Sequence, residues 1–151
     1  MKSCWKTGLT LHRYQAGRIR WIPPGTNMEP GKNMKSRILL IDDDRSVTRL
    51  LSRVFLKHEF EVIVANNGPE GIQLAREQGP EAIILDLSLP QLNGWQVCRE
   101  IRRFSNAPIV IYSGNTDPNT KDSILAEGAN CFLAKPAPLN ELVAAVQGAV
   151  G

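Results

Sequence analysis

The stretch RILLIDDDRSVTRLLSRVFLKHEFEVIVA, residues 37–65, decides the fold. It opens with the apolar run 38–41, continues through a segment of helical length, and closes with the apolar run 62–65. Short continuous runs of branched apolar residues are typical of strands that are buried on both faces. Between the two runs, apolar residues recur with the spacing of an amphipathic helix at Val47, Leu50, Leu51, Val54 and Phe55. The stretch therefore predicts a parallel strand–helix–strand unit.

The same alternation continues along the rest of the chain. Further apolar runs follow at residues 82–85, 109–112 and 131–134. We expect helices in the segments between and after these runs, at 69–78, 97–104, 118–127 and 139–148. Asp117 and Pro118 have the residue types of an N-cap and a first helical position. Five strands alternating with five helices predict the α/β class, with a doubly wound five-stranded parallel sheet.

Ionisable or hydroxyl side chains follow four of the five predicted strands. Asp42 and Asp43 follow the first strand, Asp86 the third, Ser113 the fourth and Lys135 the fifth. Ligands of open parallel sheets bind outside the carboxyl ends of the strands, so we expect these side chains at one rim. Three carboxylates there repel one another unless a cation shares the site, and Mg²⁺ prefers such oxygen ligands. With a lysine and a hydroxyl beside them, the set suits phosphoryl transfer, in which a carboxylate can be the nucleophile.

Each of these residues also has an ordinary structural explanation when it is taken alone. An aspartate pair before a helix can serve as a cap that faces the helix dipole. Asp86 could be a turn residue, and Lys135 could be a solvated lysine. Their joint placement at four strand ends favours the functional interpretation. We expect the neighbouring Asp44 to be a helix cap or a surface acid rather than a ligand.

Residues 37–147 resemble the receiver domain of two-component response regulators. The resemblance implies a flavodoxin-like sheet with the strand order 2-1-3-4-5. Gly71 and Gly114 depart from the family, which commonly has alanine at both positions, and we expect Gly71 to weaken its helix modestly. The resemblance rests on motifs in the family's order and spacing: Ile41-Asp42-Asp43-Asp44, Leu85-Asp86-Leu87-Ser88-Leu89-Pro90 with Asn93-Gly94, Tyr112-Ser113-Gly114, Gly128-Ala129 and Lys135-Pro136.

The resemblance implies a metal site and a phosphorylation site that share residues. Asp86 corresponds to the family's phospho-acceptor. Asp43 and Asp86 are expected to ligate Mg²⁺ directly, together with the backbone carbonyl of Ser88. Asp42 is expected to act through a metal-bound water.

The resemblance also implies a switch and its partners. Ser113 is expected to hydrogen-bond the phosphoryl group, and Lys135 to pair with one of its oxygens. Phe132 holds the place of an aromatic residue that changes rotamer on activation, and the Lys135–Pro136 bond is expected to be cis. The phosphoryl donor would be a sensor histidine kinase or a histidine phosphotransfer protein. The chain would catalyse only its own phosphorylation and dephosphorylation.

The formal charge of +3 is the sum of two unlike segments. Residues 1–35 hold seven basic residues and one acid, for +6, whereas residues 36–151 sum to −3. Residues 1–36 show no sustained helical or strand period, so we expect a basic, disordered extension before a receiver domain at 37–151. The alternative is a DNA-binding transcriptional regulator that uses this basic arm, and nucleic-acid binding is the less favoured interpretation.

Other function classes find little support in the sequence. No apolar run is long enough for a membrane span, and no secretory signal is recognisable, so a cytoplasmic protein without membrane contact is expected. The three cysteines form no C-x-x-C pair that would indicate zinc. With no output domain expected after the last helix, output would pass through contact with a downstream protein or a phosphorelay. A small hydrolase using the same rim is a further alternative, although no substrate-specificity cap is recognisable.

Overall fold

Five parallel strands form a single sheet in the order β2-β1-β3-β4-β5. The computed structural model describes residues 35–115 and 117–150. The expected basic extension lies outside them apart from its last two residues. The predicted α/β class and strand order are confirmed. The strands are β1 (Arg37–Ile41), β2 (Glu61–Ala65), β3 (Ala82–Leu85), β4 (Ile109–Ser113) and β5 (Cys131–Ala134).

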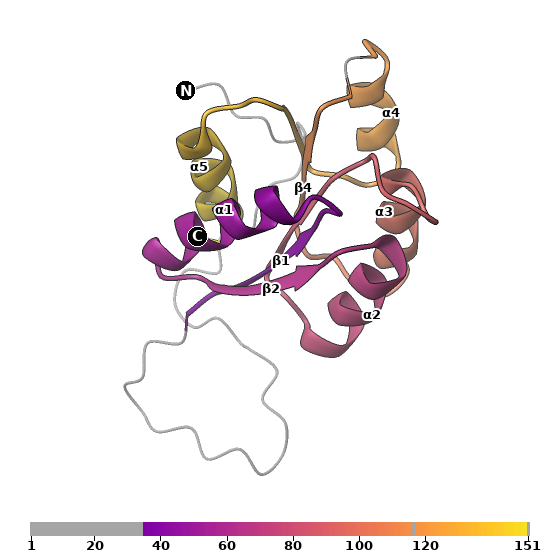
Figure 1. Cartoon of the computed structure of the whole chain (residues 1–151). Helices are drawn as coiled ribbons and strands as arrows, with labels where there is room; N and C mark the ends of the chain where they lie inside the picture. The colour runs from indigo at the N-terminus through magenta and orange to yellow at the C-terminus, as the bar shows by residue number, and fades with distance from the viewer. Residues whose placement is uncertain (1–34, 116, 151) are drawn as a thin grey trace.

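Helices cover both faces of the sheet, with α1 and α5 on one side and α2, α3 and α4 on the other (Figure 1). Within the described residues, no helix is both long and apolar enough to cross a bilayer. The helices are α1 (Arg45–Lys57), α2 (Gly68–Gln78), α3 (Gly94–Arg102), α4 (Thr120–Ala126) and α5 (Leu139–Val150).

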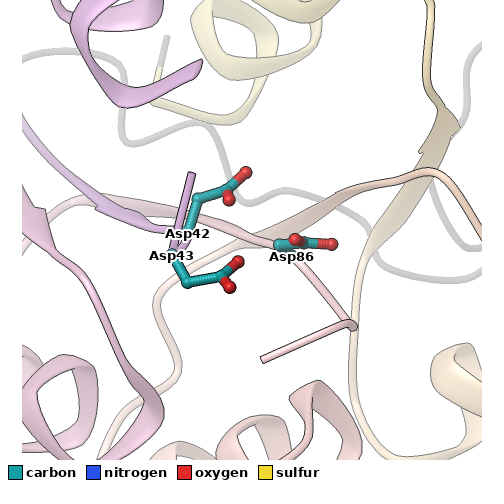
Figure 2. Close-up of side chains that lie close together, drawn as sticks. All are labelled: Asp42, Asp43 and Asp86. Atoms are coloured by element: carbon teal, nitrogen blue, oxygen red, sulfur yellow. The ribbon is translucent and has the colours of Figure 1, made fainter. Parts of the chain in front are cut away.

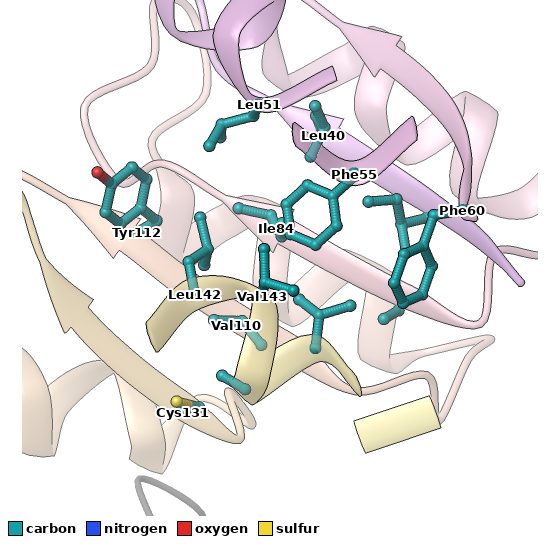
Figure 3. Packing of buried hydrophobic residues seen from close by; sticks show 14 residues of the cluster. Leu40, Leu51, Phe55, Phe60, Ile84, Val110, Tyr112, Cys131, Leu142 and Val143 are labelled. Atoms are coloured by element: carbon teal, nitrogen blue, oxygen red, sulfur yellow. The ribbon is translucent and has the colours of Figure 1, made fainter. Parts of the chain in front are cut away.

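The alternating side chains of the central strands divide the core into two clusters. In β1, Ile38 and Leu40 face α1 and α5, whereas Leu39 and Ile41 face the opposite helices. All four are at most 1% exposed, which explains why the strand reads as a continuous apolar run. In the first cluster the rings of Phe55 and Phe60 meet edge to face, 5.5 Å apart (Figure 3).

The turn from β1 into α1 is set by Asp44. Its Oδ1 accepts the backbone N–H groups of Ser46 at 2.8 Å and Val47 at 3.4 Å, so Asp44 is the N-cap of α1. The predicted capping role of Asp44 is confirmed. Only three residues therefore separate the end of β1 from the start of α1, which leaves Asp42 and Asp43 at the rim.

Gly71 does more than lower the helical propensity of α2. A Cβ at this position would lie 2.6 Å from Cδ1 of Ile41, a residue that is itself only 1% exposed. Glycine thus allows α2 to approach β1 closely, and the expectation that Gly71 only weakens the helix is incomplete. No such constraint holds at Gly114, where an added Cβ would meet nothing within 4 Å.

The predicted start of α4 at Pro118 is wrong by two residues. Asp117 does not cap the helix, because its Oδ1 accepts the N–H of Asn119 at 2.9 Å in an Asx turn. Asn115 makes a similar turn onto the N–H of Asp117, also at 2.9 Å. These two consecutive turns delay the helix until Thr120, whose hydroxyl donates to Oδ1 of Asn115 at 3.0 Å.

Candidate functional site

Three aspartates meet where β1 and β3 end. Asp42 and Asp43 follow β1, and Asp86 follows β3, its immediate neighbour in the sheet. One carboxylate oxygen from each of the three residues lies within 4.8 Å of the other two, and Figure 2 shows the three side chains side by side. Asp42 and Asp86 are only 5% and 6% exposed, whereas Asp43 is open to solvent. The predicted clustering of these acids at one rim is confirmed.

Backbone hydrogen bonds fix where these aspartates stand. The N–H of Asp42 donates to the carbonyl of Ala65 at 3.1 Å, and the N–H of Asp86 donates to that of Ile41 at 2.9 Å. Both bonds continue the ladder of the sheet one residue past the strands. Because that ladder is buried and regular, the carboxylates are positioned by rigid elements rather than by mobile loops.

Further backbone N–H groups bind the two buried carboxylates. Oδ1 of Asp42 accepts the N–H of Asp44 at 2.9 Å, and Oδ1 of Asp86 accepts the N–H of Ser88 at 3.2 Å. In each case one carboxylate oxygen is held by the turn that follows the strand. The other oxygen, Oδ2, is the one nearer to the lysine of the site.

Lys135 brings a cation to the acidic cluster from the end of β5. Its Nζ lies 2.9 Å from Oδ2 of Asp42 and 3.7 Å from Oδ2 of Asp86. Its own N–H donates to the carbonyl of Ser113 at 2.9 Å, which joins the ends of β4 and β5. The peptide bond to Pro136 is cis, as the sequence predicts. The predicted approach of Lys135 to the acids is therefore also observed.

Burial and charge act on the ionisation of this cluster in opposite directions. Burial raises the pKa of Asp42 above its ordinary value of 3.8. The hydrogen bonds from Lys135 and Asp44 lower it, and the charge of Asp86 raises it further. Burial lowers the pKa of Lys135, but the hydrogen bond and charge of Asp42, followed by the charge of Asp86, outweigh burial and raise it overall. Lys135 is therefore protonated, and its single positive charge does not balance the negative charges of the aspartates around it.

Replacing Lys135 with methionine should raise the pKa of Asp42 still further. Methionine removes the hydrogen bond and the positive charge that favour the carboxylate, while burial and Asp86 remain. Since a pKa above the unfolded value means that ionisation of Asp42 opposes folding, the variant should also lose stability as the pH rises through that pKa. Carboxyl ¹³C NMR titration without divalent cations measures the shift. The exposed Lys121→Met is the control, and a fall in the pKa of Asp42 in the Lys135 variant would contradict the expectation.

Of the other predicted site residues, Ser113 and Ser88 lie at the same edge of the sheet, whereas Phe132 lies within β5. Ser113, the last residue of β4, is fully buried, and its Oγ accepts the N–H of Asn115 at 3.3 Å. Ser88 is exposed in the loop after Asp86, and its contact with that residue is through its N–H. Phe132, in β5, is half-buried and packs against the cluster beneath α2, α3 and α4. The side chain of Phe132 is therefore only partly buried in the core and only partly open to solvent.

Tyr112 is a neighbour of the site that the sequence did not single out. The centroid of its ring lies 5.4 Å from Nζ of Lys135, within the range of a cation–π contact. Tyr112 is 8% exposed and reads as an ordinary core residue of β4. The contact follows from the pairing of β4 with β5, in which Tyr112 lies opposite Leu133. Since Lys135 is two residues after Leu133, its side chain lies on the same face of the sheet as Tyr112.

The donor atoms of the rim fit a hard divalent cation. Three carboxylates provide oxygen ligands that one ion could reach. The negative charge of these acids exceeds the positive charge that Lys135 and the surrounding backbone N–H groups supply. Mg²⁺ is commonly held by one or two carboxylates together with water and phosphate oxygens. The same cation would relieve the repulsion between Asp42 and Asp86.

Comparison with known proteins gives a consistent result. The family model described as "Response regulator receiver domain" matches residues 38–147. The "DNA-binding response regulator MtrA" of Mycobacterium leprae (strain TN) is 39% identical over 116 residues, which are 76% of this chain and 51% of that protein. The same identity and length hold for MtrA of Mycobacterium tuberculosis (strain ATCC 25618 / H37Rv), of which 50% is covered. The chain thus spans about half the length of the curated relatives it matches.

Solved structures agree with this assignment. A two-component response regulator from Clostridium difficile has a TM-score of 0.74 at 26% identity, over 77% of this chain and 96% of that one. The BeF3-activated N-terminal receiver domain of Klebsiella pneumoniae RstA has a TM-score of 0.73 at 25% identity, over 76% and 98%. The chain belongs to the response regulator receiver domain family of two-component signalling.

Proposed function

We propose that the chain is a phosphorylation-dependent switch in which Asp86 accepts a phosphoryl group. The observation that carries this proposal is the meeting of Asp42, Asp43, Asp86 and Lys135 at the carboxyl ends of adjacent strands. A carboxylate at the centre of such a group is a suitable nucleophile, because a metal and an ammonium group can offset the charge that collects around it. Membership of the receiver family supports the same assignment.

Asp43 and Asp86 would hold Mg²⁺ directly with the backbone carbonyl of Ser88, and Asp42 would act through a water. The exposure of Asp43, and the engagement of both oxygens of Asp42 by the N–H of Asp44 and by Lys135, support this division. When bound, Mg²⁺ supplies positive charge to the oxygens of the transferring phosphoryl group. Lys135 lies 3.7 Å from Oδ2 of Asp86, so a small movement of its flexible side chain would bring it to a phosphoryl oxygen there.

In the transfer step, a carboxylate oxygen of Asp86 forms a bond to phosphorus. The bond between phosphorus and the donor's histidine nitrogen breaks, and that nitrogen keeps the electron pair. The donor is a sensor histidine kinase or a histidine phosphotransfer protein, and the product is an aspartyl phosphate. The reverse and hydrolytic steps use the same residues, so catalysis would be limited to the chain's own phosphorylation and dephosphorylation.

The conformational response would pass from Ser113 to the face formed by α4, β5 and α5. Ser113 is buried and its hydroxyl already accepts the N–H of Asn115, so a hydrogen bond to a phosphoryl oxygen would pull on the loop after β4. Phe132 is half-buried on β5 and can turn inward as that loop moves. Both changes would bias an equilibrium between two conformations that a downstream protein tells apart.

We assign residues 37–151 to the receiver domain and residues 1–36 to a separate basic extension, and we propose a cytoplasmic location. The downstream target would be a protein reached by direct contact or by phosphorelay. The alternative, a DNA-binding regulator that uses the basic arm, gains some support from the mycobacterial relatives, which are named DNA-binding response regulators. An electrophoretic shift assay on the full chain and on residues 36–151 separates the two, since loss of specific DNA binding on truncation would favour the alternative.

Acetyl phosphate with Mg²⁺ should add one phosphoryl group to the protein, and the adduct should be absent when the metal is chelated. The metal is needed because the carboxylates of Asp42 and Asp43 would otherwise repel an incoming phosphate. Intact-mass spectrometry measures the adduct. Equal phosphorylation with and without the chelator, or no adduct in either sample, would contradict the proposal. Ca²⁺ in place of Mg²⁺ serves as a control for general charge screening.

A further inference from the structure

A groove of about 500 Å³ runs between α1 and β2 at the edge of the sheet. It lies apart from the acidic cluster, since none of the three aspartates lines it. β2 is an edge strand of the sheet and, within the described residues, pairs with β1 alone. The groove is lined by Arg45, Thr48, Arg49, Ser52, Arg53, Val64 and Asn66.

Arg45, Arg49 and Arg53 form a row along one flank of α1. They are spaced four residues apart, so their Cα atoms rise along the helix in steps of about 6 Å. All three are exposed, and within residues 35–115 and 117–150 no hydrogen bond or ion pair engages any of their guanidinium groups. Three uncompensated guanidinium groups in a row are unusual on a segment whose net charge is −3.

The rest of the lining adds no positive charge to that of the arginines. The hydroxyl of Thr48 donates to the carbonyl of Arg45 at 3.1 Å, and that of Ser52 donates to the carbonyl of Thr48 at 2.6 Å. The N–H of Asn66 donates to Oε2 of Glu70 at 3.0 Å. The guanidinium groups are therefore the principal free donors of the groove, and they select for a ligand that carries several negative charges.

We propose that this groove binds an acidic segment of a partner protein in an extended conformation. Alternate side chains of an extended chain recur every 6.6 Å or so, close to the step between successive arginines. Acidic residues at every second position would thus each meet one arginine, and guanidinium groups match carboxylates in geometry. The residues between them would point away from α1, on the side where β2 presents Val64.

The groove favours a peptide over nucleic acid. None of its lining residues is aromatic, so bases would find no surface on which to stack. The charge of −3 on residues 36–151 also opposes a long polyanion more than a short acidic peptide. Glu70 and Asp44 add negative charge near the end of the groove that lies by the rim. A short segment that stays beside Arg49 and Arg53 avoids both acids.

The test uses the full chain and a fluorescent, end-blocked peptide that alternates glutamate with threonine. Fluorescence anisotropy should show binding that weakens with salt, and Arg49→Gln/Arg53→Gln should weaken it roughly tenfold, the equivalent of about 1.4 kcal/mol. The matched control is Arg103→Gln/Lys121→Gln, which removes the same charge from the exposed C-cap of α3 and from an exposed position on α4. The control double variant should bind as the parent does. The corresponding glutamine–threonine peptide should not bind.

Photo-crosslinking from the peptide locates its contact, because the basic residues 1–35 could also attract it. Cross-links to α1 and β2 support the proposal, and cross-links confined to the basic segment overturn it. Equal weakening in both double variants, or no binding of the glutamate peptide, also overturns it. Tighter binding of oligo-thymidine than of the peptide, lost in the Arg49/Arg53 variant, would identify the groove as a nucleic-acid site instead.

Discussion

Asp86→Asn should abolish phosphorylation by acetyl phosphate in the presence of Mg²⁺. Two carboxylates of the cluster, those of Asp42 and Asp86, are deeply buried and near Lys135. Asp42 is already paired with Nζ of that lysine at 2.9 Å, whereas Oδ2 of Asp86 lies 3.7 Å from it. The substitution therefore removes the carboxylate that is left to act as the nucleophile. An amide oxygen is a poor nucleophile towards phosphorus, so no acyl phosphate can form at position 86. Intact-mass spectrometry should detect the adduct in the parent protein and none in the variant.

The variant should remain folded, because the asparagine oxygen can still accept the N–H of Ser88. A melting curve close to that of the parent would confirm that loss of the adduct reflects lost chemistry. Asp44→Asn is the matched control: it changes a carboxylate at the same rim that serves as the cap of α1, and asparagine caps helices about as well as aspartate. An adduct that persists in Asp86→Asn would show that another group is the acceptor.

The strands were predictable from sequence because burial on both faces leaves a direct trace. Every side chain of β3 is buried, so residues 82–85 form an unbroken apolar run. The acids that follow such runs could be placed at one rim without coordinates, because parallel strands all end on the same side. Asp42, Asp43 and Asp86 were found in this way, and the observed cluster agrees with the prediction.

Local pattern could not predict turns in which hydrogen bonds compete, nor contacts between distant segments. The start of α4 depends on hydrogen bonds that the side chains of Asn115 and Asp117 accept in place of capping, and either residue type could cap or turn. Gly71 looked like a weak helix residue because the sequence does not show that Ile41 lies directly beneath it. The contact between Lys135 and Tyr112 likewise requires the pairing of β4 with β5.

Gly94→Ala should destabilise the protein by about 3 kcal/mol, near the upper end of what overpacking costs. Gly94 is the first residue of α3, and its N–H donates to the carbonyl of Leu87 at 3.0 Å. An added Cβ would lie 2.6 Å from Cα of Leu87 and 2.8 Å from the carbonyl oxygen of Asp86. Both atoms belong to the backbone, so the clash cannot be relieved by rotating a side chain.

Relief would instead require the loop after Asp86 to move away from α3. That loop carries Ser88, whose N–H holds the carboxylate of Asp86, so phosphorylation of the variant should slow as its stability falls. Gly114→Ala is the matched control at the same rim, because its Cβ would meet nothing within 4 Å and its stability should change by less than about 1 kcal/mol. Chemical denaturation and the initial rate of adduct formation measure the two effects. Parent-like values for Gly94→Ala would show that the loop adapts without cost and that its contact with Asp86 does not limit phosphorylation.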